Sequence, residues 1–428
     1  MRNGLRRAAV AGASQAVSSV QNFAALSFIA QASSATSFGR VSLLVAVQVG
    51  AVGVGQALFG QPFIILYSDR IEGFAREAHR VLNGATLYSI LVSAVAAVVA
   101  VFAAGEWRNL LLAFAIGFPA LHLQEQFRAV LFARGETNTA LASDLTWVAA
   151  WGAALAVAGD HGAIALYSIW LTSAVFGVLV GAGRMRIWFR PSSSDLRWWF
   201  GQTKEMRGPL VFEYLTVNGT NQLATLGVGG LIGLAPSGGL RAGQAIVGPI
   251  NTALTALSML TLPELVRAGG ATNGRGRRLT SILTLVATVG ALISVPIVLY
   301  LGSRWGSALF GSSWQYAAPI VFLLLLQRVA MGLGMGAGTA LLADRHARRS
   351  ASARSIGAVC GLLMTTVGAW RGGLVGSCYG LLLGSLLTSA LLVAARRSVL
   401  KAHVNGDAKE GSDLMKPSAL PVPGGEHP

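Results

Sequence analysis

The 428-residue sequence is short of charge, because Asp, Glu, Lys and Arg together make up only 12% of it, about half of their usual share in globular proteins. It is also short of cysteine. Cys360 and Cys378 both stand in apolar runs, so neither a disulfide framework nor a CxxC metal site can form. Six scattered histidines give no zinc-binding pattern. These shortages argue against a soluble domain and against a resident metal or other cofactor.

Motifs of several common enzyme classes are missing as well. The sequence contains no GxxxxGK[ST] phosphate-binding loop, no HExxH zinc motif and no nucleophile elbow. The longest loop expected on the outer side, about 302–316, is too short to form a catalytic domain. An integral-membrane enzyme of envelope polysaccharide assembly therefore remains only as an alternative, with Glu106, Asp160 and His161 as the outer acids and histidine available to it.

Apolar residues are abundant, at 53% of the chain, and they gather in runs long enough to cross a bilayer as helices of about 20 residues. The first run is interrupted by polar residues and reads as a retained span rather than a cleaved signal peptide. We predict an all-α polytopic membrane protein with about twelve transmembrane helices. The runs lie near 10–32, 41–66, 82–104, 110–133, 140–158, 163–183, 208–233, 241–263, 280–301, 317–342, 354–370 and 374–395.

The basic excess supports this count of spans. Lys and Arg number 33 against 17 Asp and Glu, a formal charge of +16, and most of the cations fall in alternate loops. Cytoplasmic loops of membrane proteins carry such an excess, so we expect a bacterial inner-membrane protein with both termini in the cytoplasm. Because the excess is explained by topology, nucleic acid is not expected as a partner.

The runs divide into two sets of six around a basic linker. We predict an N-terminal six-helix lobe at 1–183, a cytoplasmic amphipathic linker at 184–207, a C-terminal six-helix lobe at 208–395 and a disordered cytoplasmic tail at 396–428. Within the linker, Ser192 is a suitable N-cap for a short helix rich in aromatic and basic residues.

The two halves repeat in part. Arg40 and Arg241 each follow a glycine by one or two residues, and each precedes a proline, Pro62 or Pro263, by 22 residues. A second pair, Pro119 and Arg128 in span four with Pro319 and Arg328 in span ten, has an offset of 200. It is weaker, because matching the inner ends of these spans (Leu131-Phe132-Ala133 with Leu341-Leu342-Ala343) requires an offset of 210 instead. An even number of spans in each half makes these parallel repeats, related by an axis along the membrane normal.

With FG..SLL ahead of span two, GGLRAGQ ahead of span eight and LPEL at its end, the chain resembles a known family over roughly residues 10–395. It looks like the polysaccharide-exporter branch of the multidrug/oligosaccharidyl-lipid/polysaccharide (MOP) flippase superfamily. The resemblance implies two six-helix lobes in a V shape, as in the related MATE transporters, around a central cavity that opens alternately to either side.

The same resemblance implies a function. Members of this branch are flippases that move a polyprenyl-(pyro)phosphate-linked saccharide across the inner membrane for cell-surface polysaccharide biosynthesis, and relatives receive the phosphates in a cationic cavity. The expected partners are the lipid-linked saccharide, membrane lipids, and glycosyltransferases or a polymerase of the same pathway. H⁺ or Na⁺ is the candidate coupling ion. A cation-coupled multidrug exporter of the same superfamily is the alternative, and it would favour an acidic, aromatic cavity with Glu213 and Asp144 dominant.

Arg328 lies inside span ten with no acidic neighbour within one helical turn. Ionisable groups at membrane depth usually mark a pathway or a buried partner, and a guanidinium matches phosphate geometry. We interpret Arg328 as a ligand for an anionic substrate. The alternatives are a structural pair with an acid on another helix and a side chain that reaches the interface.

Span seven is unusually polar for a membrane helix, since Glu213, Asn218 and Asn221 all fall within it. We interpret it as a cavity wall, with Glu213 as a proton or Na⁺ site or as the partner of Arg328. The alternative is a polar contact between helices. Span one carries a corresponding polar set that includes Gln15 and Asn22, so we expect both helices to face the cavity.

Four further residues are secondary candidates. Arg128 follows Glu125 by three residues, which predicts a pair within one helix unless Arg128 instead reaches toward the interface. Arg40 and Arg241, the repeat-related pair at the expected outer mouth, would attract a phosphate, form an outer gate or serve as plain loop cations.

Overall fold

The computed structural model describes residues 2–68, 73–158, 162–187 and 191–414, and within these ranges the chain is helical with no strand. The first half contains α1 (Arg2–Gln31), α2 (Ala35–Gly55), the π-helical turn η1 (Gln56–Gly60), α3 (Gln61–Tyr67), α4 (Phe74–Phe102), α5 (Glu106–Arg134), α6 (Thr137–Ala158), α7 (Ala163–Thr172) and α8 (Ala174–Met185). The short α9 (Ser193–Gln202) follows. The second half contains α10 (Arg207–Tyr214), the π-helical turn η2 (Leu215–Gly219), α11 (Thr220–Leu231), α12 (Leu234–Arg267), α13 (Gly274–Phe310), the 3₁₀ turn η3 (Gly311–Ser313), α14 (Trp314–Ala343) and α15 (Ala347–Leu414).

Each of the twelve predicted runs coincides with a helix or with consecutive helices. The last two runs are the halves of α15, which breaks at Gly372 and Gly373, where Gly373 has a φ of 58°. By length and composition, eight stretches of the described chain could cross a membrane, and some of these join two helices. The stretches formed by α1 and by α10–α11 are not among the eight, which agrees with their high polar content.

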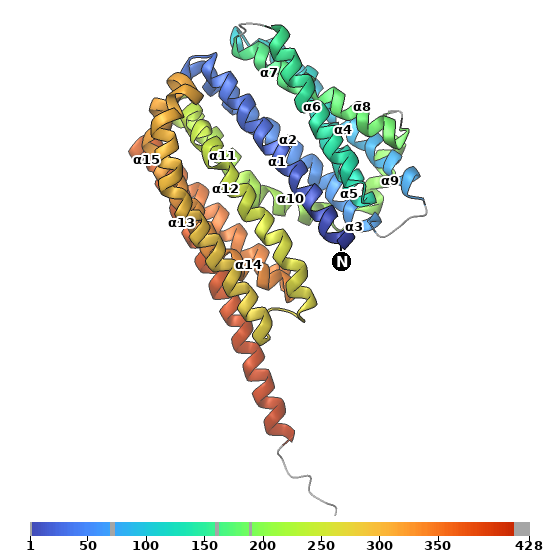
Figure 1. Ribbon diagram of the computed structural model, residues 1–428, viewed down its shortest axis with the longest axis vertical. Helices are drawn as coiled ribbons and strands as arrows, with labels where there is room; N and C mark the ends of the chain where they lie inside the picture. The colour runs from blue at the N-terminus through green and yellow to red at the C-terminus, as the bar shows by residue number, and fades with distance from the viewer. Residues whose placement is uncertain (1, 69–72, 159–161, 188–190, 415–428) are drawn as a thin grey trace, which may run out of the picture.

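The helices form two lobes that meet near one end and diverge toward the other (Figure 1). We call α1–α9 the N lobe and α10–α15 the C lobe. Buried aromatic residues such as Phe118 and Trp147 fill one end of the N lobe, and Phe63 and Trp199 fill the other. The C lobe has its own apolar core around Leu240 and Leu324. This arrangement is the expected V-shaped bundle of a polytopic membrane protein.

Glycine contacts close the end where the lobes meet. A Cβ at Gly39 of α2 would lie 1.9 Å from the carbonyl oxygen of Leu234 in α12, and one at Gly238 would lie 3.0 Å from that of Ala35. Gly39 is the glycine of the repeat before Arg40, and Gly238 directly precedes Gly239, the corresponding glycine before Arg241. Because only glycine permits such an approach of backbones, the repeat marks the junction of the lobes at this end.

The linker helix α9 packs on the N lobe at the opposite end. Ser192 is its N-cap, as predicted, and accepts a hydrogen bond from the backbone N–H of Asp195. Asn83 of α4 donates to the Asp195 carboxylate at 2.9 Å. The fully buried Trp199 donates from its indole N–H to the carbonyl oxygen of Leu58 at 2.9 Å. The amphipathic helix is therefore a fixed part of the N lobe.

The structure differs from the prediction in the tail. Helix α15 continues to Leu414, so the part from 396 to 414, expected to be disordered, is helical, and 415–428 lie outside the described residues. The chain from Arg396 onward contains helix-favouring Ala and Lys, and no proline occurs before Pro417. Nothing in this segment therefore forces the helix to end where the apolar run ends.

Candidate functional site

A polar cavity of about 380 Å³ lies within the C lobe, between η2, α11, α12, α14 and α15. No described residue that lines it is acidic or aromatic. Its polar lining consists of the side chains of Thr216, Thr220, Asn221, Asn251, Thr255, Ser258, Gln327, Arg354, Ser385, Thr388 and Ser389. The cavity therefore offers hydroxyls, amides and one guanidinium to a ligand, a set suited to sugars and anions.

Arg328 of α14 lies directly behind this cavity and is not itself among the lining residues. It is only 4% exposed. Its Nη1 donates to the Asn251 side-chain oxygen at 3.3 Å and contacts the Met331 sulfur at 3.2 Å, and both of these neighbours line the cavity. Its Nε is buried without a hydrogen-bond acceptor. Of the described carboxylates none pairs with Arg328, so the alternative of an acidic partner on another helix is not seen.

Two lining residues were missed from the sequence. Arg354 was not singled out, although the predicted run 354–370 begins with it, and it lies in the second turn of α15 and lines the cavity. Asn251 of α12 was not singled out. The spacing of Asn251, Thr255 and Ser258, at positions i, i+4 and i+7, places them on one helix face, and this polar face was the signal available in the sequence.

Span one divides its polar residues between two faces. Gln15 and Asn22 are exposed on α1, on the same face as Ser19. The Ser19 hydroxyl lies 3.2 Å from that of Thr252 in α12, across the junction of the lobes. Gln15 and Asn22 thus lie on the side of α1 that faces the C lobe. The other half of the set, including Ser14, is buried inside the N lobe.

Span seven is divided in a similar way. Asn221 lines the cavity, and Asn218 lies in η2 with a side chain outside the described part of the structure. Glu213 was predicted as a possible partner of Arg328, and that pairing is wrong. Glu213 is exposed on α10, ahead of the π-helical turn, and it is not among the residues that line the cavity. The negative charge of Glu213 acts electrostatically on Arg354, but the two described side chains form no ion pair.

The N lobe contains a second polar cluster, around Asp144 of α6. Asp144 is fully buried, and it accepts hydrogen bonds from the Ser14 hydroxyl of α1 and from Gln124 Nε2 of α5, the latter at 2.6 Å. The predicted pair of Arg128 and Glu125 is confirmed, with 2.6 Å between Nη2 and Oε2. Arg128 also acts electrostatically on Asp144. Two carboxylates thus share one guanidinium inside the lobe.

The repeat-related arginines do not stand as free loop cations. Arg40 lies in α2 and forms an ion pair with Glu106 at the start of α5. Arg241 is 7% exposed, two turns into α12, with Nη1 and Nη2 each 3.5 Å from a glutamine oxygen, those of Gln244 and Gln222. The expected outer-loop position of Arg241 is wrong because Pro236 fits into the first turn of α12 and does not end the helix.

Comparison with known proteins identifies the fold. No family model and no curated protein matches the sequence. Among solved structures, the chain is similar to an inward-facing multidrug resistance MATE transporter of the MOP superfamily, with a TM-score of 0.65, 16% identity, and coverage of 91% of this chain and 95% of the other. The outward-facing conformation of a MATE transporter gives a TM-score of 0.59 at 13% identity, covering 93% and 95%. A MOP superfamily transporter from Pyrococcus furiosus gives 0.63 at 13%, with the same coverage. The chain has the fold of these transporters.

Proposed function

We propose that the protein is a flippase that moves a polyprenyl-(pyro)phosphate-linked saccharide across the bacterial inner membrane, for cell-surface polysaccharide biosynthesis. The headgroup crosses the membrane by alternating access, in which movement of the two lobes opens the protein first to one side and then to the other. The orientation follows from the basic loops, with both termini in the cytoplasm. Partners of the protein are the lipid-linked saccharide, membrane lipids, and the glycosyltransferases or polymerase that make and use the substrate.

One observation carries this proposal, namely the chemistry of the C-lobe cavity. A saccharide presents hydroxyls, which pair with the hydroxyl and amide side chains of the lining. A pyrophosphate presents anionic oxygens, which suit Arg354 in the lining and Arg328 behind Asn251 and Met331. A multidrug exporter of organic cations would favour acids and aromatic rings, and the described lining has neither. In the Pyrococcus furiosus transporter, a reverse polarity of the binding pocket is said to suggest a different function.

The shape of the molecule supports alternating access. The lobes touch at the end of Gly39 and Leu234, and they diverge toward the end that carries the basic loops (Figure 1). In the proposed orientation this is an inward-open state, in keeping with the similarity to an inward-facing transporter. A headgroup made in the cytoplasm would meet the protein in this state.

We further propose that an ion drives the cycle, with H⁺ or Na⁺ bound in the N lobe rather than at Glu213. Asp144 and Glu125 share a single guanidinium, that of Arg128, so the cluster holds one excess negative charge when both acids are ionised. Uptake of one cation neutralises it, which lowers the free energy of the buried cluster. An exposed Glu213 offers no comparable gain.

The test is an assay for accumulation of lipid-linked oligosaccharide in cells that lack the chromosomal gene and carry plasmid variants. Arg354→Gln and Arg328→Gln should each lower flipping about tenfold or more, because a charge-assisted contact contributes about 1.5–3 kcal/mol. Arg328→Lys should give an intermediate value, since an ammonium keeps the charge but loses the planar fork.

Arg348→Gln is the matched control, because Arg348 is an exposed cation near Arg354 that does not line the cavity. Protein levels are compared by immunoblot. Wild-type transport by both Gln variants would overturn the role of the arginines. Efflux of ethidium that depends on Asp144, with no effect on lipid-linked saccharide, would favour the multidrug alternative instead.

A further inference from the structure

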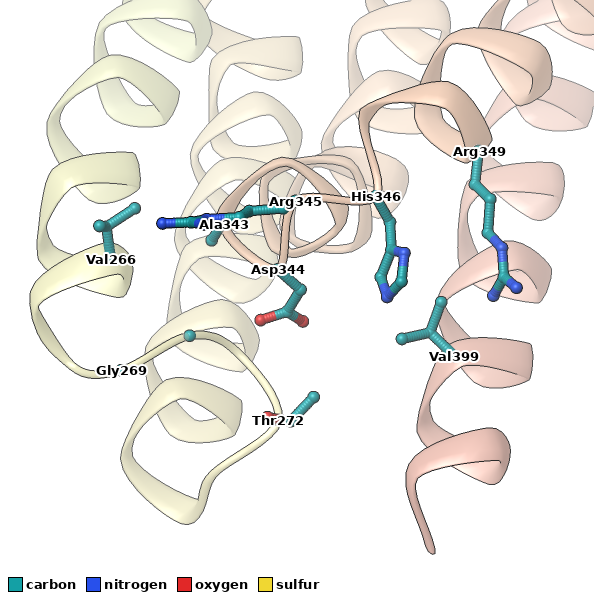
Figure 2. A pocket seen from close by; sticks show the side chains of 10 residues that line it. Val266, Gly269, Thr272, Ala343, Asp344, Arg345, His346, Arg349 and Val399 are labelled. Carbon is teal, nitrogen blue, oxygen red and sulfur yellow. The ribbon is translucent and has the colours of Figure 1, made fainter. Parts of the chain in front are cut away.

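A second large pocket, of about 550 Å³, lies at the inner end of the C lobe, away from the substrate cavity. It is formed by the α12–α13 loop, the α14–α15 turn and the late part of α15. Figure 2 shows Asp344, His346 and Arg349 on the same side of the turn, and Arg345 extending toward Val266. Three segments distant in sequence thus build one pocket at a corner of the lobe.

The cationic side chains of this pocket have no partner among the other described residues. Arg345, His346 and Arg349 make no side-chain hydrogen bond or ion pair with another described residue, whereas arginines such as Arg40 and Arg128 are paired. The carboxylate in the pocket is that of Asp344, and it already accepts a hydrogen bond of 2.6 Å from the backbone N–H of Ala271. The pocket therefore has a net positive charge with free guanidinium donors.

The backbone at Arg345 is in the left-handed region, with a φ of 62°. The N–H of Arg345 donates to the carbonyl of Leu342 and that of His346 donates to Leu341 at 2.8 Å, which is a left-handed C-cap of α14. Glycine is the usual residue at this position because a Cβ is unfavourable there. An arginine is thus held at a position where glycine would be conformationally easier.

The repeat provides an internal comparison. Spans four and ten correspond at their inner ends, and α5 ends in the same cap with Gly135 at a φ of 76°. In the N lobe the next residue, Glu136, pairs with Arg134 at 3.1 Å and with Arg184 at 2.8 Å. Both of these arginines at the corner of the N lobe are therefore paired with a carboxylate. The C-lobe corner has the same backbone but carries unpaired cations beside a pocket.

We infer that this inner-corner pocket, lined by Arg345, His346 and Arg349, binds a phosphate group. Guanidinium forks match phosphate oxygens in a bidentate manner. Val266, Ala343 and Val399 add an apolar wall beside the cations, and the volume falls in the range of small-ligand pockets. The phosphate is supplied by the headgroup of an acidic phospholipid in the adjacent leaflet or by a soluble phosphate compound, and the experiment separates these sources.

The experiment measures binding to the purified full-length protein by native mass spectrometry. In one arm, phosphatidylglycerol is titrated against phosphatidylcholine as the zwitterionic comparison. In the other, sodium phosphate is the competitor. Arg345→Gly and Arg349→Gln should each weaken phosphatidylglycerol binding about tenfold, the loss expected for one charge-assisted contact. Arg345→Gly also relaxes the backbone, so a loss of binding with it does not reflect unfolding.

Two matched controls remove the same charges elsewhere. Arg186 ends α8 with a φ of 55°, so Arg186→Gly changes the same kind of cap in the other lobe. Arg348→Gln removes an exposed cation beside the pocket that does not line it. Both controls should bind as the wild type does.

Each outcome supports or overturns the inference. If phosphatidylglycerol binding is lost selectively in the two pocket variants, the ligand is a phospholipid headgroup. If millimolar phosphate displaces phosphatidylglycerol from the wild type but not from these variants, the ligand is a soluble phosphate compound. Equal binding by all four variants, or no preference of the wild type for phosphatidylglycerol together with no effect of phosphate, overturns the inference.

Discussion

Tyr214 of the C lobe donates a hydrogen bond of 2.7 Å from its hydroxyl to the backbone carbonyl of Val49 in the N lobe. Its ring lies directly against α2, because a Cβ at Gly53 would be 1.7 Å from the Tyr214 Cζ. Tyr214 is the last residue of α10, immediately before the π-helical turn η2. A single side chain thus connects the helix that begins the C lobe to the second span of the N lobe.

Tyr214→Phe should weaken the junction between the lobes by about 1 kcal/mol, the net contribution of one such hydrogen bond. Tyr88→Phe is the control, because the Tyr88 hydroxyl donates to the carbonyl of Ala51, also in α2 but within the N lobe, at 2.8 Å. Distances between spin labels on the two lobes should change in Tyr214→Phe only. If both variants keep the wild-type distance distribution, Tyr214 does not hold the lobes together.

Gly39→Ala should open the end where the lobes meet. The added Cβ would overlap the carbonyl of Leu234, a backbone group that cannot move aside without shifting α12. Gly50→Ala in the same helix is the control, since nothing lies within 4 Å of a Cβ there. Hydrogen–deuterium exchange should rise at residues 32–40 and 231–238 in Gly39→Ala alone. Unchanged exchange in both variants would contradict a closed glycine junction.

Arg128→Gln should destabilise the N lobe by about 3 kcal/mol, because it leaves the buried carboxylate of Asp144 and the half-buried carboxylate of Glu125 without their cation. The double variant with Glu125→Gln should recover much of this loss, since it removes one of the acids. Thermal unfolding in detergent measures both effects. A double variant less stable than Arg128→Gln would show that the pair is not the main interaction of either residue.

Trp199→Ala should release α9 from the N lobe. The change removes a fully buried ring and its hydrogen bond to Leu58, a loss of about 3–5 kcal/mol for a large buried aromatic residue. Trypsin should then cleave faster at Arg197 and Lys204. Gly201→Ala is the control, because Gly201 is an exposed residue of the same helix and a Cβ there would have no neighbour within 4 Å. Equal cleavage rates in both variants would be evidence against a docked linker.

The fold was predictable because its signals are local. Apolar length defined the spans, Ser192 marked the start of the linker helix, and the three-residue spacing of Glu125 and Arg128 predicted their pair. The correspondence of Leu131 with Leu341 also agrees with the two left-handed caps that end α5 and α14. The N-cap, the ion pair and the two caps each depend on residues within a few positions of one another.

The candidate site was less predictable because it depends on how helices pack. Arg241 and Arg354 are both arginines near the end of an apolar run, and the sequence does not show that one is buried behind glutamines while the other lines a cavity. The exposed position of Glu213 depends on the rotation of α10 against its neighbours. The burial of Arg328 could be anticipated, since a lone arginine in the middle of a span is visible in sequence alone.

All described residues that line the C-lobe cavity belong to one lobe, which has a consequence for the energetics of the proposed transport. A headgroup held by one rigid body travels with it, and contacts that stay the same in both conformations do not shift the equilibrium between them. Any preference of bound substrate for one state must therefore come from groups that approach or leave during the movement. In the proposed mechanism, the face of α1 that carries Gln15 and Asn22 provides such groups, so the N lobe would sense a cargo that the C lobe holds.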